Sequence, residues 1–194
     1  MFGEGFDRLL AAARRGDESA WTKLYLDLAP VLTGYLAGQR CPGPEDVTSE
    51  TLLQVVRDIG RFSGDESQFR SWVFTIAHHR MIDERRKQGA RPADAMGNEF
   101  LEDRGPIETF EDEAIANLGP AELEHLLRAT SPGQRDVLLL RYVADLSLHE
   151  AAEVLGKDYN AVKALHRRGL DALRAHVGSE EYRVQAARTL SPSG

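Results

Sequence analysis

The sequence lacks several features around which enzymes and secreted proteins are often built. It holds a single cysteine, Cys41, in 194 residues, which excludes an internal disulfide and a cysteine-rich zinc site. No run of about 18 apolar residues is present, so we expect no membrane insertion. The first ten residues include Glu4 and Asp7 and lack an apolar signal region, which favours a cytoplasmic location. There is no glycine-rich phosphate loop and no nucleophile elbow, so we expect no enzyme activity and no cofactor.

The charge of the chain is unevenly distributed. The net charge of −7 by itself argues against a nucleic-acid partner. Residues 92–127, however, hold ten acidic and one basic residue, a net of −9, so the rest of the chain carries −7 + 9 = +2. Residues 80–91 and residues 157–174 each hold five basic and two acidic residues. Two basic clusters therefore flank one acidic segment, and each cluster is a candidate nucleic-acid contact.

Apolar residues recur at helical spacing almost everywhere, and no clean two-residue alternation occurs, which predicts an all-α fold. The first half predicts four helices. Asp17 is placed to cap the second and Pro44 suits the first turn of the third. We expect Trp21 and Tyr25 on the buried face of the second helix, and Val56 on that of the third. A fourth helix follows the break at residues 62–65 and ends in the basic run of residues 85–87.

The second half begins after a segment rich in Gly, Pro and acidic residues. We expect residues 1–90 to form one domain, residues 91–119 a flexible acidic linker with a short helix near 109–117, and residues 120–178 a second domain, followed by a loosely held tail at 179–194. Capping boxes at residues 131–134 and 147–150 predict two helix starts in the second domain. A long acidic linker between two self-contained helical patterns favours domains that share little interface.

The second domain contains a helix-turn-helix pattern. A short helix with small residues, Ala151 and Ala152, ends at Gly156, and a longer helix with Lys163, His166 and Arg167 off its apolar face follows. Such a helix suits the major groove, because an apolar back docks it and long donors reach phosphates and purine edges. The alternative is an ordinary amphipathic helix with a solvated basic face.

One helix of the first domain, residues 69–86, interleaves aromatic and basic side chains. This combination suits unstacked single-stranded DNA, since aromatic faces stack on bases while arginine follows the backbone. The alternative is that Phe69 and Trp72, three residues apart, belong mostly to the core. His78 and His79 point about 100° apart on a helix, and the acidic run at 111–113 lies in a weakly periodic segment, so we expect no metal site in either place.

These motifs together resemble the extracytoplasmic-function (ECF) class of bacterial sigma factors, in the sigma-70 family. Residues 69–86 resemble the region 2 pattern of the class, with matches that include Phe69, Arg70, Trp72, Ile76, Ala77, Asp83 and Arg86. Asp46, Glu50 and Thr51 match its D-x-x-Q-E-T-F motif. Residues 132–142 resemble the start of region 4, and Val162, Lys163 and Arg168 match its recognition helix.

The resemblance implies a function and a set of contacts. A sigma factor directs core RNA polymerase to promoters by recognising the −10 and −35 elements and by melting the DNA. It implies that the polymerase β and β′ subunits are partners, reached through Asp46, Glu50, Thr51 and Gln54. For the −10 element, in double- and single-stranded form, we expect contacts from Arg70, Trp72, His79, Arg80, Arg85 and Arg86. For the −35 duplex we expect contacts from Lys163, His166, Arg167 and Arg168, of which His166 and Arg167 rest on helix position alone.

Members of this class are commonly held by an anti-sigma protein, so we expect such a partner too. The sequence also departs from the pattern of the class. Ser49, Leu52 and Val56 replace the usual Gln, Phe and Trp, and His79 stands where Asn is usual. Two rival functions remain open at this point. One is a helix-turn-helix regulator with an unrelated N-terminal helical sensor domain, and the other is a nuclease that uses the acidic cluster.

Overall fold

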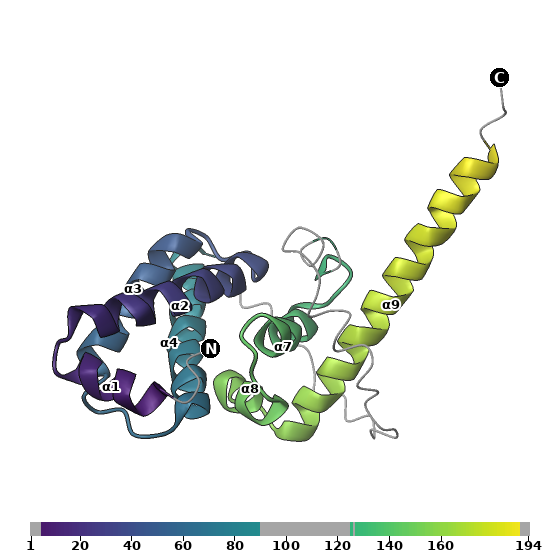
Figure 1. The fold of residues 1–194 in the computed structure, drawn as a ribbon. Coiled ribbons are helices and arrows are strands. Elements are labelled where there is room, and N and C mark those ends of the chain that lie inside the picture. Colours follow the sequence, from purple (N-terminus) through teal and green to yellow (C-terminus); the bar gives the residue numbers. More distant parts are fainter. Residues whose placement is uncertain (1–4, 90–124, 126, 191–194) are drawn as a thin grey trace.

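The structure is a computed structural model that describes residues 5–89, 125 and 127–190. Its regular elements in these ranges are all helices, which confirms the predicted all-α class (Figure 1). They are α1 (Phe6–Arg14), α2 (Glu18–Gly38), α3 (Pro44–Asp58), α4 (Glu66–Lys87), α7 (Pro132–Tyr142), α8 (Leu148–Leu155) and α9 (Tyr159–Leu190). The predicted linker at 91–119 and the short helix near 109–117 lie outside the described residues, and so does the acidic run at 111–113.

Local capping signals set where the helices begin. Asp17 Oδ1 accepts a hydrogen bond from the backbone N–H of Ala20 at 2.9 Å, and Pro44 occupies the first turn of α3, as predicted. The capping boxes Ser131–Gln134 and Ser147–Glu150 are both present, so they start α7 and α8. A third capping box, between Asp65 and Gln68, starts α4 and was not predicted.

The N-terminal unit is built from α1 to α4. Helix α2 packs against α1, α3 and α4, and α3 also packs against α4. Aromatic side chains join these helices in the core. The rings of Phe6 and Phe69 lie 5.4 Å apart between centroids, and those of Tyr35 and Phe74 meet edge to face at 5.4 Å. Phe69 is fully buried, so for this residue the alternative of a place in the core is confirmed, whereas Trp72 is only partly buried.

The C-terminal unit is built from α7, α8 and α9, each of which packs against the other two. Gly156 ends α8 in the left-handed conformation, with φ of 60°, and thereby allows the tight turn into α9. Helices α7 and α9 also approach closely at a glycine. A Cβ added at Gly169 would lie 2.9 Å from Leu138 Cδ1, so a larger residue would push the end of the Leu138 side chain aside. The predicted helix-turn-helix is therefore confirmed.

Helix α9 continues to Leu190, whereas the sequence favoured a helix that ends near Gly178. A single glycine costs a helix about 1 kcal/mol relative to alanine. The residues after it are rich in Glu, Arg, Gln and Ala, which are strong helix formers, so they continue the helix across Gly178.

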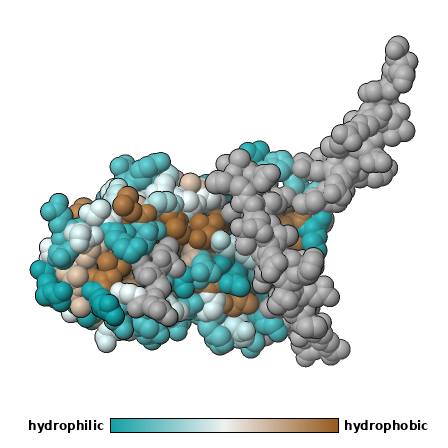
Figure 2. Space-filling view, viewed as in Figure 1, coloured by the Kyte–Doolittle hydropathy of each residue, from teal (hydrophilic) through white to brown (hydrophobic). Residues whose placement is uncertain are grey.

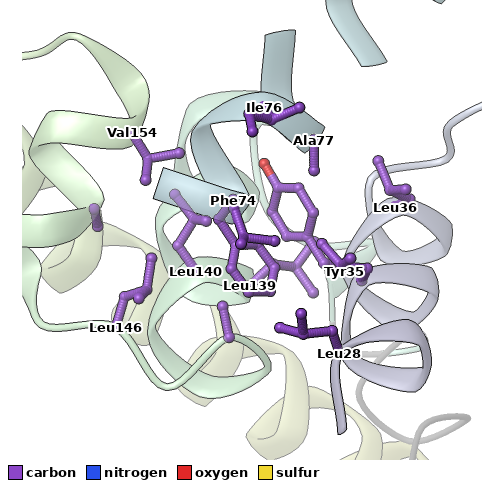
Figure 3. Close-up of a cluster of buried hydrophobic side chains, with 14 of the residues drawn as sticks. Leu28, Tyr35, Leu36, Phe74, Ile76, Ala77, Leu139, Leu140, Leu146 and Val154 are labelled. Carbon is purple, nitrogen blue, oxygen red and sulfur yellow. The ribbon is translucent and has the colours of Figure 1, made fainter. Parts of the chain in front are cut away.

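The two units pack against each other, and the expectation that they share little interface is wrong. Helix α8 lies directly on α4, and α7 contacts α2 (Figure 1). Apolar side chains of both units, among them Leu28 and Phe74 on one side and Leu139 and Leu146 on the other, form one buried cluster (Figure 3). The sequence did not reveal this interface because residues of α4 and α8 lie about 80 positions apart.

The contact between α2 and α7 is close at Gly38. A Cβ added there would lie 2.7 Å from Leu139 Cδ2, so a larger residue would push the end of the Leu139 side chain aside. Burial raises the pKa of the Tyr35 phenol well above its usual value, and the charge of Asp136 on α7 adds to the rise. Tyr35 therefore lies in the interior formed by both units.

Candidate polymerase- and DNA-binding surfaces

Helix α3 carries the four residues that the sequence assigned to polymerase binding. Asp46 and Glu50 are exposed and Gln54 is half-buried. Thr51 is fully buried, and its hydroxyl donates a hydrogen bond to the carbonyl of Val47 at 2.7 Å. The prediction that Thr51 contacts a partner is therefore wrong, because its side chain lies in the core between the helices.

Exposed apolar side chains lie beside these polar residues and were missed by the sequence reasoning. The N-terminal unit shows apolar patches on its surface (Figure 2). Its most exposed large apolar residues are Tyr25, Leu26, Leu53 and Val56, with exposures of 57%, 63%, 55% and 49%. Tyr25 and Val56 were expected in the core, so that expectation is wrong.

An apolar groove of about 210 Å³ runs between α2 and α3. Its lining includes Tyr25 and Val56, together with Trp21, Leu24, Leu28, Leu52 and Val55. Exposed apolar residues next to carboxylates are typical of a protein interface rather than of a solvated helix face. The sequence did carry a signal of this exposed apolar surface. The apolar residues of the third predicted helix cover a wider sector of the helix than one buried face requires.

Arg80 on α4 connects the two predicted surfaces of this unit. Its guanidinium donates to Glu50 Oε2 at 2.7 Å and to Gln54 Oε1 at 2.8 Å. Arg80 was assigned to the −10 element, and its partners were assigned to polymerase. The structure therefore joins them in one network at the junction of α3 and α4.

The aromatic side chains of α4 pack mainly on one another. Trp72 is half-buried and stacks on Phe62, with ring centroids 5.2 Å apart and an interplanar angle of 28°. This face of the indole is occupied by protein, so a DNA base would have to use the opposite face or its edge.

The basic residues of α4 differ in their availability. Arg86 and His79 are exposed, and Arg86 lies 3.3 Å from Asp83. Arg85 donates a hydrogen bond to the carbonyl of Gln39. The side chain of Arg70 is 14% exposed, and its Nη1 pairs with Asp145 of the C-terminal unit. In this arrangement Arg70 does not face solvent, contrary to its assignment as a free DNA contact.

The adjacent histidines of α4 have different environments. His78 is buried, and its Nδ1 lies 2.9 Å from the Tyr35 hydroxyl, while His79 faces outward. Burial lowers the pKa of His78 to about 4, and the charges of His79, Arg85 and Lys157 contribute in the same direction. His78 is therefore neutral at physiological pH and belongs to the core.

The recognition helix α9 presents three of its four predicted DNA contacts. Lys163, Arg167 and Arg168 are partly exposed. His166 is 1% exposed, its Nε2 lies 3.0 Å from the hydroxyl of Tyr142, and the two rings stack. The prediction that His166 reads the duplex is wrong, because the side chain joins α9 to α7.

Comparison with known proteins identifies the family. Residues 24–91 match the family described as Sigma-70 region 2, and residues 121–173 match Sigma-70, region 4. The probable RNA polymerase sigma-C factor of Mycobacterium bovis is 30% identical over 71% of this chain and 71% of its own length. The chain belongs to the ECF sigma factors of the sigma-70 family. As a sigma factor, it directs core RNA polymerase to promoters and binds promoter DNA.

Two further comparisons concern the sequence and the fold of this sigma factor. The ECF RNA polymerase sigma factor BldN of Streptomyces coelicolor is 30% identical over 85% of this chain, which spans 63% of the length of BldN. A solved structure of CnrH in complex with the cytosolic domain of CnrY aligns with a TM-score of 0.63 and 24% identity. That alignment covers 91% of this chain and 99% of CnrH, so the two share their fold.

The sigma factor assignment accounts for the site as a whole. Helices α2 to α4 lie within region 2 from residue 24 onward, and the helix-turn-helix lies in region 4. Sigma factors recognise DNA rather than catalyse a reaction. Among the described residues, no group of three or more potential ligand side chains is placed to hold a metal ion. No helix in the described part of the chain has the length and apolar character needed to cross a membrane.

Proposed function

We propose that this sigma factor binds core polymerase through the surface of α2 and α3. The observation that carries this proposal is the exposure of Leu53 and Val56 beside Glu50 on one helix. Apolar side chains at the centre and charged ones at the rim are the composition of a protein interface. Asp46 and Gln54 extend the same surface. The β and β′ subunits of polymerase are the partners that this surface would meet.

We infer further that α9 reads the −35 duplex through Lys163, Arg167 and Arg168, and that exposed basic residues of α4 contact the −10 element. His79 and Arg86 are exposed and available for this role in the structure as it stands, and Arg85 lies beside them. Arg80 is partly exposed and would have to exchange its contacts with Glu50 and Gln54 for contacts with DNA. Trp72 and Arg70 would join after a rearrangement. The protein would act in the cytoplasm, where polymerase is found, and without enzyme activity of its own.

The rival interpretations differ in what they explain. A helix-turn-helix regulator with an unrelated sensor domain does not account for the region 2 match at residues 24–91. A nuclease would have to use the acidic run at 111–113, which lies outside the described residues. The predicted domain limits, 1–90 and 120–178, stay predictions.

Run-off transcription with purified core polymerase on a library of genomic fragments tests the proposal. Wild-type protein should give discrete transcripts, and Leu53→Glu should abolish them while leaving helicity unchanged. Arg57→Glu, a change at an exposed position of the same helix, serves as the control and should retain most transcripts. Transcripts of equal yield from Leu53→Glu and wild type would remove α3 from the interface.

An inhibitory partner also fits this protein. CnrH, which shares the fold, was solved with the cytosolic domain of CnrY bound to it. An anti-sigma protein that covers the groove between α2 and α3 would compete directly with polymerase. Affinity purification from cells under non-inducing conditions should recover a protein other than polymerase in near-equal amount. Recovery of polymerase subunits alone would place regulation elsewhere.

A further inference from the structure

Two histidines of the C-terminal unit meet although they lie 51 positions apart in the sequence. His125 precedes α7 and is exposed, and His176 lies on α9 and is partly exposed. Their Nε2 atoms are 3.4 Å apart, and their ring centroids are 5.2 Å apart at an interplanar angle of 52°. Neither residue belongs to the surfaces assigned above to polymerase or DNA, so the pair needs an explanation of its own.

The turn before α7 holds His125 in place. The carbonyl of His125 accepts a hydrogen bond from the backbone N–H of Arg128 at 3.2 Å. Two residues after His125, Leu127 is 2% exposed, and its carbonyl accepts hydrogen bonds from the Thr130 hydroxyl at 2.7 Å and from Arg135 Nη2 at 2.9 Å. A buried side chain and these hydrogen bonds therefore fix the backbone next to His125.

Helix α9 holds the other histidine. Leu170 and Leu173, which precede His176 on this helix, are each 4% exposed, and α9 packs against both α7 and α8. Both imidazoles are thus carried by backbone that is fixed by buried leucines. Ligand side chains on such elements are preorganised, because little conformational freedom is lost when they bind a shared ion.

The distance between the two nitrogens fits a shared metal ion better than a hydrogen bond. Hydrogen bonds from N–H groups usually join heavy atoms about 2.7–3.2 Å apart. A zinc ion binds imidazole nitrogens at about 2.0–2.1 Å in tetrahedral geometry, which places two such nitrogens about 3.3–3.4 Å apart. The Nε2 atoms of His125 and His176, 3.4 Å apart, therefore already have the spacing of two zinc ligands.

The separation of the ring centroids favours the same arrangement. The centroid of an imidazole lies about 1.15 Å behind Nε2, so a straight hydrogen bond of this length would separate the two centroids by about 5.7 Å. Two rings that both point at one tetrahedral zinc ion would separate them by about 5.2 Å. The observed separation is 5.2 Å, which fits rings that are turned toward a common point.

The chemistry of the pair favours a divalent transition metal. Imidazole nitrogen suits zinc, copper and nickel, whereas magnesium and calcium prefer oxygen ligands. The tetrahedral spacing of the nitrogens favours zinc among these ions. No third candidate ligand side chain joins the pair within the part of the chain that the structure describes. We therefore expect water at the remaining positions of the ion, and a lower affinity than that of a structural site with four protein ligands.

We propose that His125 and His176 bind one zinc ion, which clips the beginning of region 4 to the far end of its recognition helix. The region 4 match covers residues 121–173, so one ligand lies near its start and the other lies three residues beyond its end. An ion that binds the folded protein and not the unfolded chain stabilises the fold. The zinc ion therefore stabilises region 4 from a position outside the predicted DNA contacts.

Calorimetric titration of the untagged full-length protein with zinc chloride tests the proposal. The wild type should bind one zinc ion per chain, and His125→Ala and His176→Ala should each weaken this binding at least tenfold. At a zinc concentration about ten times the Kd, the melting temperature of the wild type should rise by about 3 °C or more, and that of the variant with both alanines should not change.

Two control variants test whether other side chains are the ligands. His149→Ala changes another exposed histidine of the same unit, and Cys41→Ala removes the single thiol of the chain. Both should bind zinc as the wild type does. Loss of the zinc ion in either control, with binding retained by the variant with both alanines, would overturn the proposal.

A replacement ligand separates metal binding from a merely structural role of His176. His176→Cys keeps a metal-binding side chain, so it should bind zinc where His176→Ala does not. With cobalt(II) in place of zinc, it should also show the absorption of a thiolate–cobalt bond, which the wild type lacks.

Equal zinc affinity of the wild type and the variant with both alanines would overturn the proposal and leave the contact as a hydrogen bond. Absence of the thiolate–cobalt absorption in His176→Cys would also overturn it, since His176 would then not be a ligand. These measurements use neither polymerase nor DNA, so their failure is distinct from failure of the proposed function.

Discussion

The hydroxyl of Tyr142 lies 3.0 Å from Nε2 of His166, and this partly buried pair joins the first helix of region 4 to its recognition helix. His166 stands between two candidate DNA contacts in the sequence, Lys163 and Arg167, yet its ring stacks on Tyr142. The pair fixes how α9 is rotated against α7. It thereby determines which side chains of α9 point toward DNA.

His166→Ala should therefore lower stability rather than change sequence preference. We expect a loss of about 1–3 kcal/mol in the free energy of unfolding, because the mutation leaves a cavity in place of the buried His166 ring and removes a hydrogen-bond partner of the Tyr142 hydroxyl. Chemical denaturation monitored by circular dichroism measures it. Lys163→Ala is the matched control on the same helix and should change stability by less than about 0.5 kcal/mol. An altered −35 preference at unchanged stability would restore His166 as a DNA contact.

Arg167→Ala and Lys163→Ala should weaken binding to the −35 duplex. A side chain that reads a base edge contributes about 1–3 kcal/mol and discriminates between sequences, whereas one that contacts phosphate weakens all sequences alike. Titration of holoenzyme with promoter variants at two salt concentrations separates the two roles. Unchanged affinity of both variants for every sequence would show that α9 does not face the duplex.

Asp46→Arg should reduce the affinity for core polymerase while the helix content stays the same. Asp46 is exposed, and the N-terminus of α3 is begun by Gly43 with no side-chain cap, so α3 does not depend on Asp46 for a capping hydrogen bond. Reversing its charge places a cation where a carboxylate was available to basic residues of polymerase. A competition assay on core polymerase measures the affinity. Loss of helicity in this variant would show instead that the carboxylate stabilises the first turn of α3.

The stability of the protein should fall as the pH is lowered from about 6.5 to about 4, in part because of His78. The unfolded side chain takes up a proton near its usual pKa of 6.5, while the folded one resists it until about 4. Its contribution is therefore complete above pH 6.5 and is lost as the pH falls, by up to about 3 kcal/mol. In His78→Gln, which keeps a polar partner for Tyr35, this part of the pH dependence should disappear. If the free energy of unfolding changes equally with pH in His78→Gln and in the wild type, His78 does not contribute to this pH dependence.

The sequence by itself determined where most helices begin and which family the protein belongs to. Capping residues such as Asp17, Ser131 and Ser147 act within one turn of their own helix, and Gly156 ends α8 through its own backbone conformation. These signals are local, so they can be read without knowing what the helix packs against. The region 2 and region 4 motifs are likewise short patterns with a fixed order along the chain.

Only the tertiary structure decided which sectors of those helices are covered. Periodicity placed Thr51 and His166 on polar sectors, but neighbouring helices bury both, and it placed Val56 in the core although the side chain is half exposed. The clearest example is the contact of Arg70 with Asp145, which joins residues 75 positions apart in the sequence. Packing between distant helices depends on their relative placement in space, which helical spacing along one segment does not encode.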